Sequence, residues 1–175
     1  MIRISALFLS AAMALVASAP TQAEPATLLG AYQNWSAYSS GTGSSMTCYA
    51  LSQPRASTPR GAKRSAIYLM VSDWPGRKIK AEPQIVLGYP VKADAAASVA
   101  VGSAKFAFFA RPNNGNDGAA WLQSLAENAR LIDSMGKGVS AVASGVSARG
   151  TKTVDTYSLA GFADAMTKVH DTCKM

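Results

Sequence analysis

Two short patterns in the sequence contain a serine at a spacing that nucleophilic enzymes use. Ser134 and Lys137 have the Ser-x-x-Lys spacing of penicillin-recognising enzymes, whose serine opens a helix so that the lysine one turn later can reach it. Here the pair lies at the end of an expected helix, and neither Ser-Asp-Asn nor Lys-Thr-Gly follows. The stretch from Gly145 to Arg149 resembles half of a nucleophile elbow, but arginine replaces the second glycine. We therefore expect no catalytic serine.

The sequence contains a single histidine, which limits acid–base and metal chemistry. His170 is followed by Asp171, but neighbours on a helix point to different faces and cannot form a relay, so we expect an exposed polar helix end. Zinc needs three or four ligands, and too few are present. Asn113, Asn114 and Asp117 lack the charge density of a calcium loop. We predict no metal and no cofactor.

Positive charge is concentrated in one part of the chain, whose formal net charge is +7. Between residues 54 and 80 the only acid is Asp73, and the basic residues are Arg55, Arg60, Lys63, Arg64, Arg77, Lys78 and Lys80. One interpretation is a solvated loop rim. The other is an electropositive face for an acidic partner such as lipopolysaccharide, peptidoglycan or an anionic host surface. Nucleic acid is disfavoured because no recognition-helix pattern is present.

The N-terminus has the features of a secretory signal peptide. A short basic region ending at Arg3 precedes an apolar run to Val16, and small residues follow at 17–19 and 21–23. Pro20 makes the first cleavage position poor, so residues 1–23 are predicted to be removed after Ala23. A retained membrane anchor is disfavoured because the apolar run is shorter than the ~20 residues that span a bilayer. Residues 24–175 then form one exported domain that does not span the membrane.

The chain has two cysteines, one near each end of the expected domain. In an oxidising compartment the simplest prediction is a single disulfide between Cys48 and Cys173. A redox-active pair is disfavoured because no Cys-x-x-Cys motif is present.

Hydrophobic patterns predict a mainly β domain with two helices. Alternation over 46–51 places Cys48 on one face and Tyr49 on the other. Further strands are expected over 64–73, 83–87, 98–101, 104–109, 139–147 and 151–157, with a two-residue turn at 102–103. Helical spacing predicts helices over 121–135 and from an N-cap at Ser158 to Cys173. We expect an antiparallel β-sandwich or barrel-like domain whose C-terminal helix is disulfide-linked.

Aromatic residues are spread over these elements. We assign Trp35, Tyr68, Trp121 and Phe162 to the core, because aromatic side chains are more often core than ligand platform.

The order of features resembles the invasion-associated locus B family of exported alphaproteobacterial proteins. The likeness rests on Trp35, Cys48, the 67–71 strand, the 88–91 bend, Lys105-Phe106, Phe108, Trp121, 135–138, 149–151, 155–159, Gly161-Phe162 and Cys173. The alanine-rich stretch 93–100 departs from the family's more regular alternation. The resemblance implies a periplasmic or surface-associated, mainly antiparallel β domain, linked in some pathogens to entry into host cells. It supplies no catalytic residues.

Together these features predict a non-enzymatic envelope protein that acts by binding. The basic residues of the 55–80 region are the candidate contact, with an anionic envelope polymer or host-surface component as partner. The alternative is a small periplasmic hydrolase with an unrecognised hydroxyl nucleophile. The sequence carries no signal for the oligomeric state.

Overall fold

The structure, a computed structural model, describes residues 25–92, 97–110 and 118–175. All strands in these ranges belong to one antiparallel sheet with the order β1-β2-β3-β5-β6-β9-β8-β7-β10-β11-β4. The strands are β1 (Thr27–Tyr32), β2 (Trp35–Ser40), β3 (Thr47–Ser52), β4 (Ala56–Thr58), β5 (Tyr68–Trp74), β6 (Ile79–Val86), β7 (Ala97–Val101), β8 (Ala104–Ala110), β9 (Ala119–Trp121), β10 (Ser140–Val146) and β11 (Lys152–Ser158). The predicted mainly β domain with two helices is confirmed, and the strands form a single sheet.

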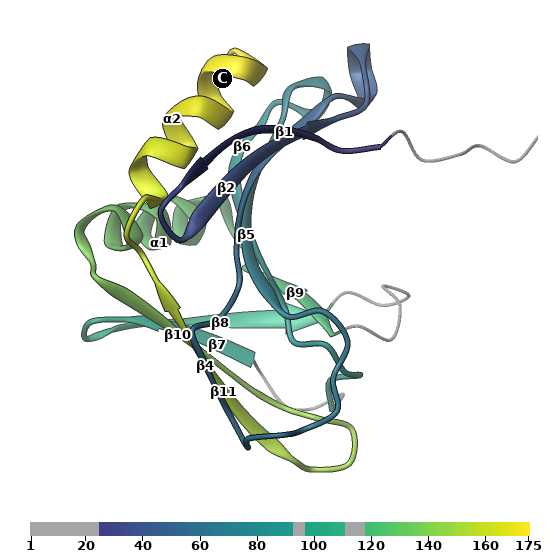
Figure 1. The fold of residues 1–175 in the computed structure, drawn as a ribbon, viewed down its shortest axis with the longest axis vertical. Coiled ribbons are helices and arrows are strands. Elements are labelled where there is room, and N and C mark those ends of the chain that lie inside the picture. Colours follow the sequence, from purple (N-terminus) through teal and green to yellow (C-terminus); the bar gives the residue numbers. More distant parts are fainter. Residues whose placement is uncertain (1–24, 93–96, 111–117) are drawn as a thin grey trace, which may run out of the picture.

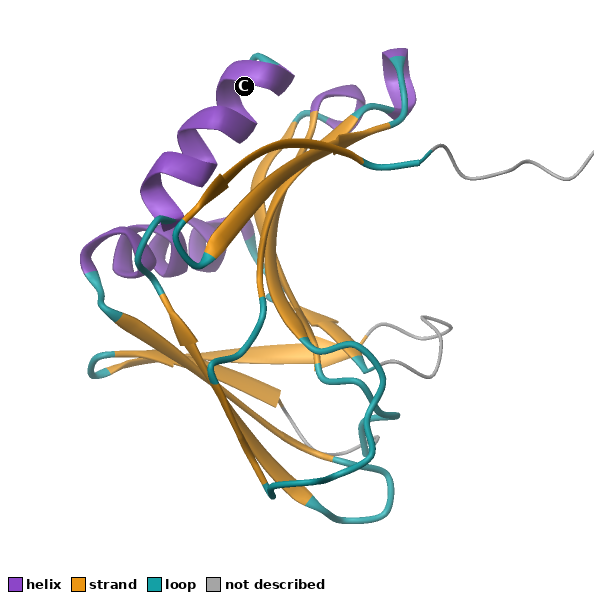
Figure 2. Cartoon of the chain, in the orientation of Figure 1, coloured by secondary structure: helices purple, strands orange, loops and turns teal. Residues whose placement is uncertain are grey.

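The sheet bends strongly, and both helices lie together on one side of it (Figure 1). Helix α1 (Leu125–Lys137) packs against β6, and helix α2 (Phe162–Cys173) packs against β1, β2, β3 and β5. Figure 2 shows the same division, with both helices on the left of the view and the strands to their right and below them. The core between them is one cluster that draws large side chains from both halves of the sheet, among them Trp35, Leu69, Phe108, Tyr157 and Val169.

Each helix buries one face because its apolar residues recur at helical spacing. In α1 these are Leu131 and Met135, and in α2 they include Phe162, Met166 and Val169. The expected disulfide is present: it joins β3 to the end of α2 between Cys48 and Cys173, whose Cα atoms are 5.9 Å apart.

Both helices begin later than the sequence pattern predicted. Helix α1 begins at Leu125, because Trp121 completes β9 and the Ser124 hydroxyl caps the helix by accepting the Glu127 N–H at 3.2 Å. The predicted cap at Ser158 is wrong, since Ser158 ends β11 and Gly161 is the N-cap of α2. Gly161 has φ +88°, and a Cβ there would lie 1.9 Å from the Tyr32 carbonyl oxygen, so only glycine fits.

The strand predictions were correct in place but incomplete. The 102–103 turn between β7 and β8 is confirmed, whereas β1 and β4 were missed. The predicted 64–73 strand begins only at Tyr68, since Arg64 belongs to the preceding loop. The predicted signal peptide, the asparagine-rich loop residues Asn113, Asn114 and Asp117, and residues 93–96 lie outside the described ranges. Among the described residues, no helix is long and apolar enough to cross a membrane.

Tyr157 is a buried residue whose hydroxyl has no hydrogen-bond partner among the described residues. Burial raises its pKa above the ordinary value, and the negative charge of Asp155 raises it further. An unsatisfied buried polar group costs about 1 to 3 kcal/mol. We therefore expect Tyr157→Phe to increase the free energy of unfolding by about 1 kcal/mol near neutral pH, measured by urea denaturation.

The same substitution should change the response to alkaline pH. Below pH of about 10 the tyrosine is protonated in both states and the stability is independent of its titration. Above that pH the unfolded chain loses this proton while the folded protein keeps it, so the wild type loses stability as the pH rises. Tyr157→Phe should lose less stability over this range. Equal losses in the two proteins would contradict the conclusion that burial raises the pKa of Tyr157.

Candidate functional site

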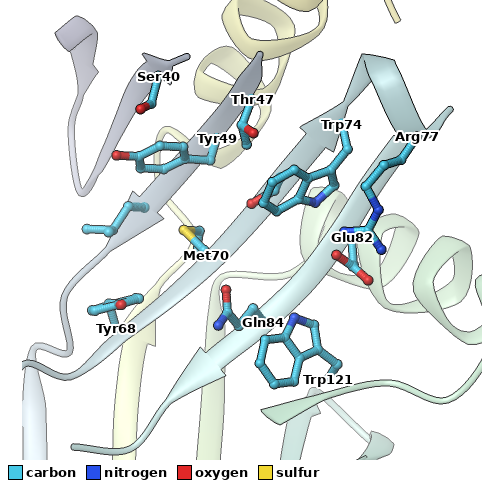
Figure 3. A pocket seen from close by; sticks show the side chains of 12 residues that line it. Ser40, Thr47, Tyr49, Tyr68, Met70, Trp74, Arg77, Glu82, Gln84 and Trp121 are labelled. Atoms are coloured by element: carbon cyan, nitrogen blue, oxygen red, sulfur yellow. The ribbon is translucent and has the colours of Figure 1, made fainter. Parts of the chain in front are cut away.

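A groove lined by aromatic and polar side chains lies on the face of the sheet opposite helix α2 (Figure 3). Its volume is about 580 Å³. The lining residues come from the β2 end, β3, β5, β6, the turn after β5, and β9: Ser40, Thr47, Tyr49, Leu51, Tyr68, Met70, Ser72, Trp74, Arg77, Glu82, Gln84 and Trp121. Alternation along the strands explains this set, because Cys48 and Leu69 point into the core and the residues beside them point the other way.

The strand register arranges the groove residues in two rows that cross the sheet. One row runs from Leu51 through Met70 and Gln84 to Trp121. The neighbouring row runs from Tyr49 through Ser72 to Glu82. Residues in such rows lie side by side on adjacent strands. Apolar and hydrogen-bonding side chains therefore lie side by side over the floor of the groove.

The groove contains one cationic and one acidic side chain, so it is close to electrically balanced. The guanidinium of Arg77 lies 5.4 Å from the centre of the Trp74 ring, a cation–π distance. Glu82 is buried in the floor. Burial also raises the pKa of Tyr49, as does the neighbouring Tyr38, whose ring stacks on it with centroids 5.3 Å apart. The groove therefore presents neutral phenols together with a cation at its edge.

The prediction that aromatic residues belong to the core is correct for two of the four. Trp35 and Phe162 are buried against each other with ring centroids 4.9 Å apart. Tyr68 and Trp121 instead line the groove. The alternation that placed Tyr49 opposite Cys48 was the sequence signal for this face. It could not show that neighbouring strands would add their own aromatic residues.

The basic residues predicted to form one surface are divided by strand β5. Arg55, Arg60 and Lys63 are exposed and precede β5, whereas Lys78 and Lys80 are exposed and follow it. The loop before β5 and the turn after β5 lie at opposite ends of that strand in Figure 1. Arg77, also beyond β5, lines the groove. The sequence cluster is therefore two separate groups in space.

Arg60 and Lys63, from the group before β5, lie near basic residues from distant parts of the chain. Strand β4 pairs with β11, which brings the loop containing Arg60 beside the β10–β11 turn. Lys63 and Arg149 line a shared hollow of about 320 Å³, and no carboxylate from the described part of the chain lines it. Lys92 and Lys152 are exposed beside the same turn. We call Arg60, Lys63, Lys92, Arg149 and Lys152 the basic end.

Arg64 is a member of the predicted basic surface, but its charged group is engaged inside the protein. Its guanidinium donates two hydrogen bonds to Asp155, at 2.8 Å to Oδ2 and 2.6 Å to Oδ1. The two side chains are only 4% and 0% exposed. The bond to Asp155 is the main reason that the pKa of Arg64 is raised. Arg64 therefore anchors the loop before β5.

His170 and Asp73 form a hydrogen-bonded pair between helix α2 and strand β5, which no local sequence pattern predicted. His170 Nδ1 lies 2.6 Å from Oδ2 of Asp73, and the other carboxylate oxygen accepts the Ala81 N–H at 2.8 Å. Asp73 is fully buried, so the expectation that His170 is only an exposed helix end is wrong. The pair borders a hollow of about 530 Å³ that is also lined by Lys78 and Lys80 but by no serine, threonine or cysteine.

The serines considered as nucleophiles have structural roles. The Ser134 hydroxyl donates to the Arg130 carbonyl at 2.8 Å within helix α1. The Ser147 hydroxyl accepts the Thr151 N–H at 3.1 Å in the β10–β11 turn. Neither lies beside the Asp73–His170 pair. Within the described ranges, no group of three or more histidine, cysteine or acidic residues could hold a metal ion.

Comparison with known families gives one match. The sequence profile described as "Invasion associated locus B (IalB) protein" matches residues 35–170, which include both sides of the groove and the basic end. No curated protein and no solved structure matches the chain.

Proposed function

The chain belongs to the Invasion associated locus B (IalB) family, and from that premise we propose that it is an exported binding protein without catalytic activity whose basic end contacts an anionic polymer. The polymer belongs to the bacterial envelope or to the host-cell surface. The disulfide between Cys48 and Cys173 supports an oxidising compartment outside the cytoplasm.

One observation carries the choice of surface. Cations from segments about ninety residues apart in sequence line a hollow that no carboxylate of the described residues lines. The nearest buried acid, Asp155, is already neutralised by Arg64. An exposed cluster of one sign raises the local concentration of oppositely charged partners and speeds their association. The β5–β6 turn is a poorer candidate because Asp133 and the Asp73–His170 pair lie beside its lysines.

The hydrolase alternative receives no support from the described residues. A hydroxyl nucleophile must lie within hydrogen-bond reach of its base. His170 is the single histidine of the sequence, and its Nδ1 is hydrogen-bonded to Asp73. The described residues that line the hollow beside it include no hydroxyl or thiol side chain.

The proposal is tested with two triple variants that remove equal charge. In the first, Arg60, Lys63 and Arg149 are replaced with glutamine, and Arg64 is kept because of its ion pair. Each cation near an anionic surface contributes about 1 kcal/mol, so we expect affinity to fall by about a hundredfold. Binding is measured on immobilised lipopolysaccharide and on immobilised heparan sulfate. The arm that shows the loss identifies whether the polymer is of envelope or host type.

The matched control replaces Lys78, Lys80 and Lys105, which are exposed elsewhere. It should lose less than about threefold, because only general attraction is reduced. High salt should abolish the wild-type binding. Equal losses in both variants, or no salt-sensitive wild-type binding in either arm, would contradict the proposal.

A further inference from the structure

The aromatic groove on the helix-free face is a second recognition surface, distinct from the basic end. It is lined by Tyr49, Tyr68, Trp74 and Trp121, with Gln84 and Glu82 between them. We propose that this groove binds an uncharged saccharide chain. The proposal goes beyond the polyanion contact because the two surfaces share no residue.

The groove combines apolar and hydrogen-bonding side chains, and a sugar ring combines the same two kinds of surface. A pyranose has apolar C–H faces, which pack against flat aromatic rings, and a rim of hydroxyl groups that each donate and accept hydrogen bonds. In the groove Met70 and Trp121 flank Gln84 in one row, and Ser72 separates Tyr49 from Glu82 in the next. Figure 3 shows Gln84 and Glu82 among the aromatic rings on the same face.

One polar atom of the groove is left unused by the protein. The Trp74 Nε1 atom is buried and has no hydrogen-bond acceptor in the described ranges. A buried donor without an acceptor is unfavourable, and a ligand oxygen would satisfy it once the side chains that cover it move aside. Arg77, whose guanidinium lies against the Trp74 ring, is an exposed side chain at this edge and adds further donors.

Other classes of ligand fit the groove less well. An extended peptide usually adds to the edge of a sheet, but the groove lies over β3, β5 and β6, which are paired on both sides. A polyanion would need several cations, whereas Arg77 is the only cation in the lining and Glu82 opposes it. A fatty acyl chain would need a continuous apolar lining, which hydroxyl, amide and carboxylate side chains interrupt here.

The groove is suited to holding a saccharide without cleaving it. Glycosidases of the common mechanisms place two carboxyl groups on either side of the bond to be cut. Among the described residues Glu82 is the only carboxylate in the lining, and Asp73 on the neighbouring strand points into the core. The volume of about 580 Å³ lies within the range of small-molecule binding sites, which suits a short stretch of a chain.

The experiment titrates the purified protein with chitotetraose and cellotetraose and follows tryptophan fluorescence and binding heat. Trp74 and Trp121 line the groove, while Trp35 is buried in the core and supplies a constant background. We expect saturable binding of at least one oligosaccharide. Trp121→Ala should weaken it at least tenfold, and Gln84→Ala should weaken it several-fold while leaving every tryptophan in place.

The control is Leu125→Ala, which changes an exposed apolar residue on helix α1 and should leave binding unchanged. Near-ultraviolet circular dichroism checks that each variant is folded, and Gln84→Ala keeps the test valid if Trp121→Ala does not fold. High salt should leave saccharide binding intact although it abolishes the polyanion contact. No saturable binding of either oligosaccharide, or unchanged binding in both groove variants, would overturn the inference.

Discussion

Replacing Arg64 with methionine is expected to lower the free energy of unfolding by about 3 to 5 kcal/mol. This is the known cost of removing one partner from a buried ion pair, because the remaining charge is left without compensation. Here the remaining group is Asp155, which is fully buried and accepts both guanidinium hydrogen bonds. The loss is measured by urea denaturation at neutral pH, and it is a large share of the 5 to 15 kcal/mol that is typical of a domain.

The neighbouring arginine provides the matched control. Arg60 is exposed, so Arg60→Met should change stability by less than about 0.5 kcal/mol. The double variant Arg64→Met with Asp155→Leu removes both charges and should recover much of the loss, since buried pairs are often replaceable by apolar residues. If Arg64→Met does not fold, Asp155→Asn keeps the shape of the site and breaks the same ion pair by removing the other charge. Equal stability of the Arg64→Met and Arg60→Met variants would show that the buried pair has no structural role.

The ion pair also explains why the basic cluster could not be interpreted from sequence alone. Charge counting treats Arg60, Lys63 and Arg64 alike, yet within the described ranges only Arg64 has an acidic partner, 91 residues away. The pairing of β4 with β11 creates that contact, and β4 has only three residues and no hydrophobic alternation. The same pairing recruits Arg149 and Lys152 to the basic end. Long-range strand pairing therefore decided which charges are exposed and which are buried.

Local patterns were informative where one residue's neighbours determine its environment. The alternation around Cys48 correctly separated a core face from an outer face in β3, and the turn at 102–103 was set by two residues. The groove required more, because its rows combine one or two side chains from each of several strands. Each strand contributes too little for its sequence to mark a site. The register between strands assembles the site.

The final helix was also only partly predictable. Its buried residues were correctly identified by their spacing, but its start was placed too early because Ser158 is a good N-cap by type. Asn34 donates its N–H to the Ala160 carbonyl at 3.2 Å, and the Tyr32 carbonyl lies against Gly161. These contacts come from the β1–β2 turn. The tertiary environment therefore overrode a local preference.

Cys173→Ser should produce the other large effect, a fall in melting temperature on the order of 10 °C under oxidising conditions. The disulfide joins residues 125 positions apart, and the chain-entropy model gives about 4 to 5 kcal/mol for a loop of this length. In a domain of this size each kcal/mol corresponds to about 2 to 4 °C. The measurement is differential scanning calorimetry of the oxidised wild type and the variant.

Reduction of the wild type serves as the chemical control, because it opens the same loop without changing the sequence. The reduced wild type, Cys173→Ser and the Cys48→Ser/Cys173→Ser double variant should melt within a few degrees of one another. A melting temperature that is the same for the oxidised wild type and all three would show that the disulfide does not stabilise the domain.

The effect of the disulfide on binding should be indirect, because of where Cys48 lies. Cys48 is on the core face of β3, and Tyr49 beside it faces the groove. Strand β3 is also held by its pairing with β2 and β5. Well below its melting temperature, Cys173→Ser should therefore bind saccharide and polyanion with wild-type affinity. Loss of saccharide binding in a folded Cys173→Ser variant would mean that helix α2 controls the groove through β3.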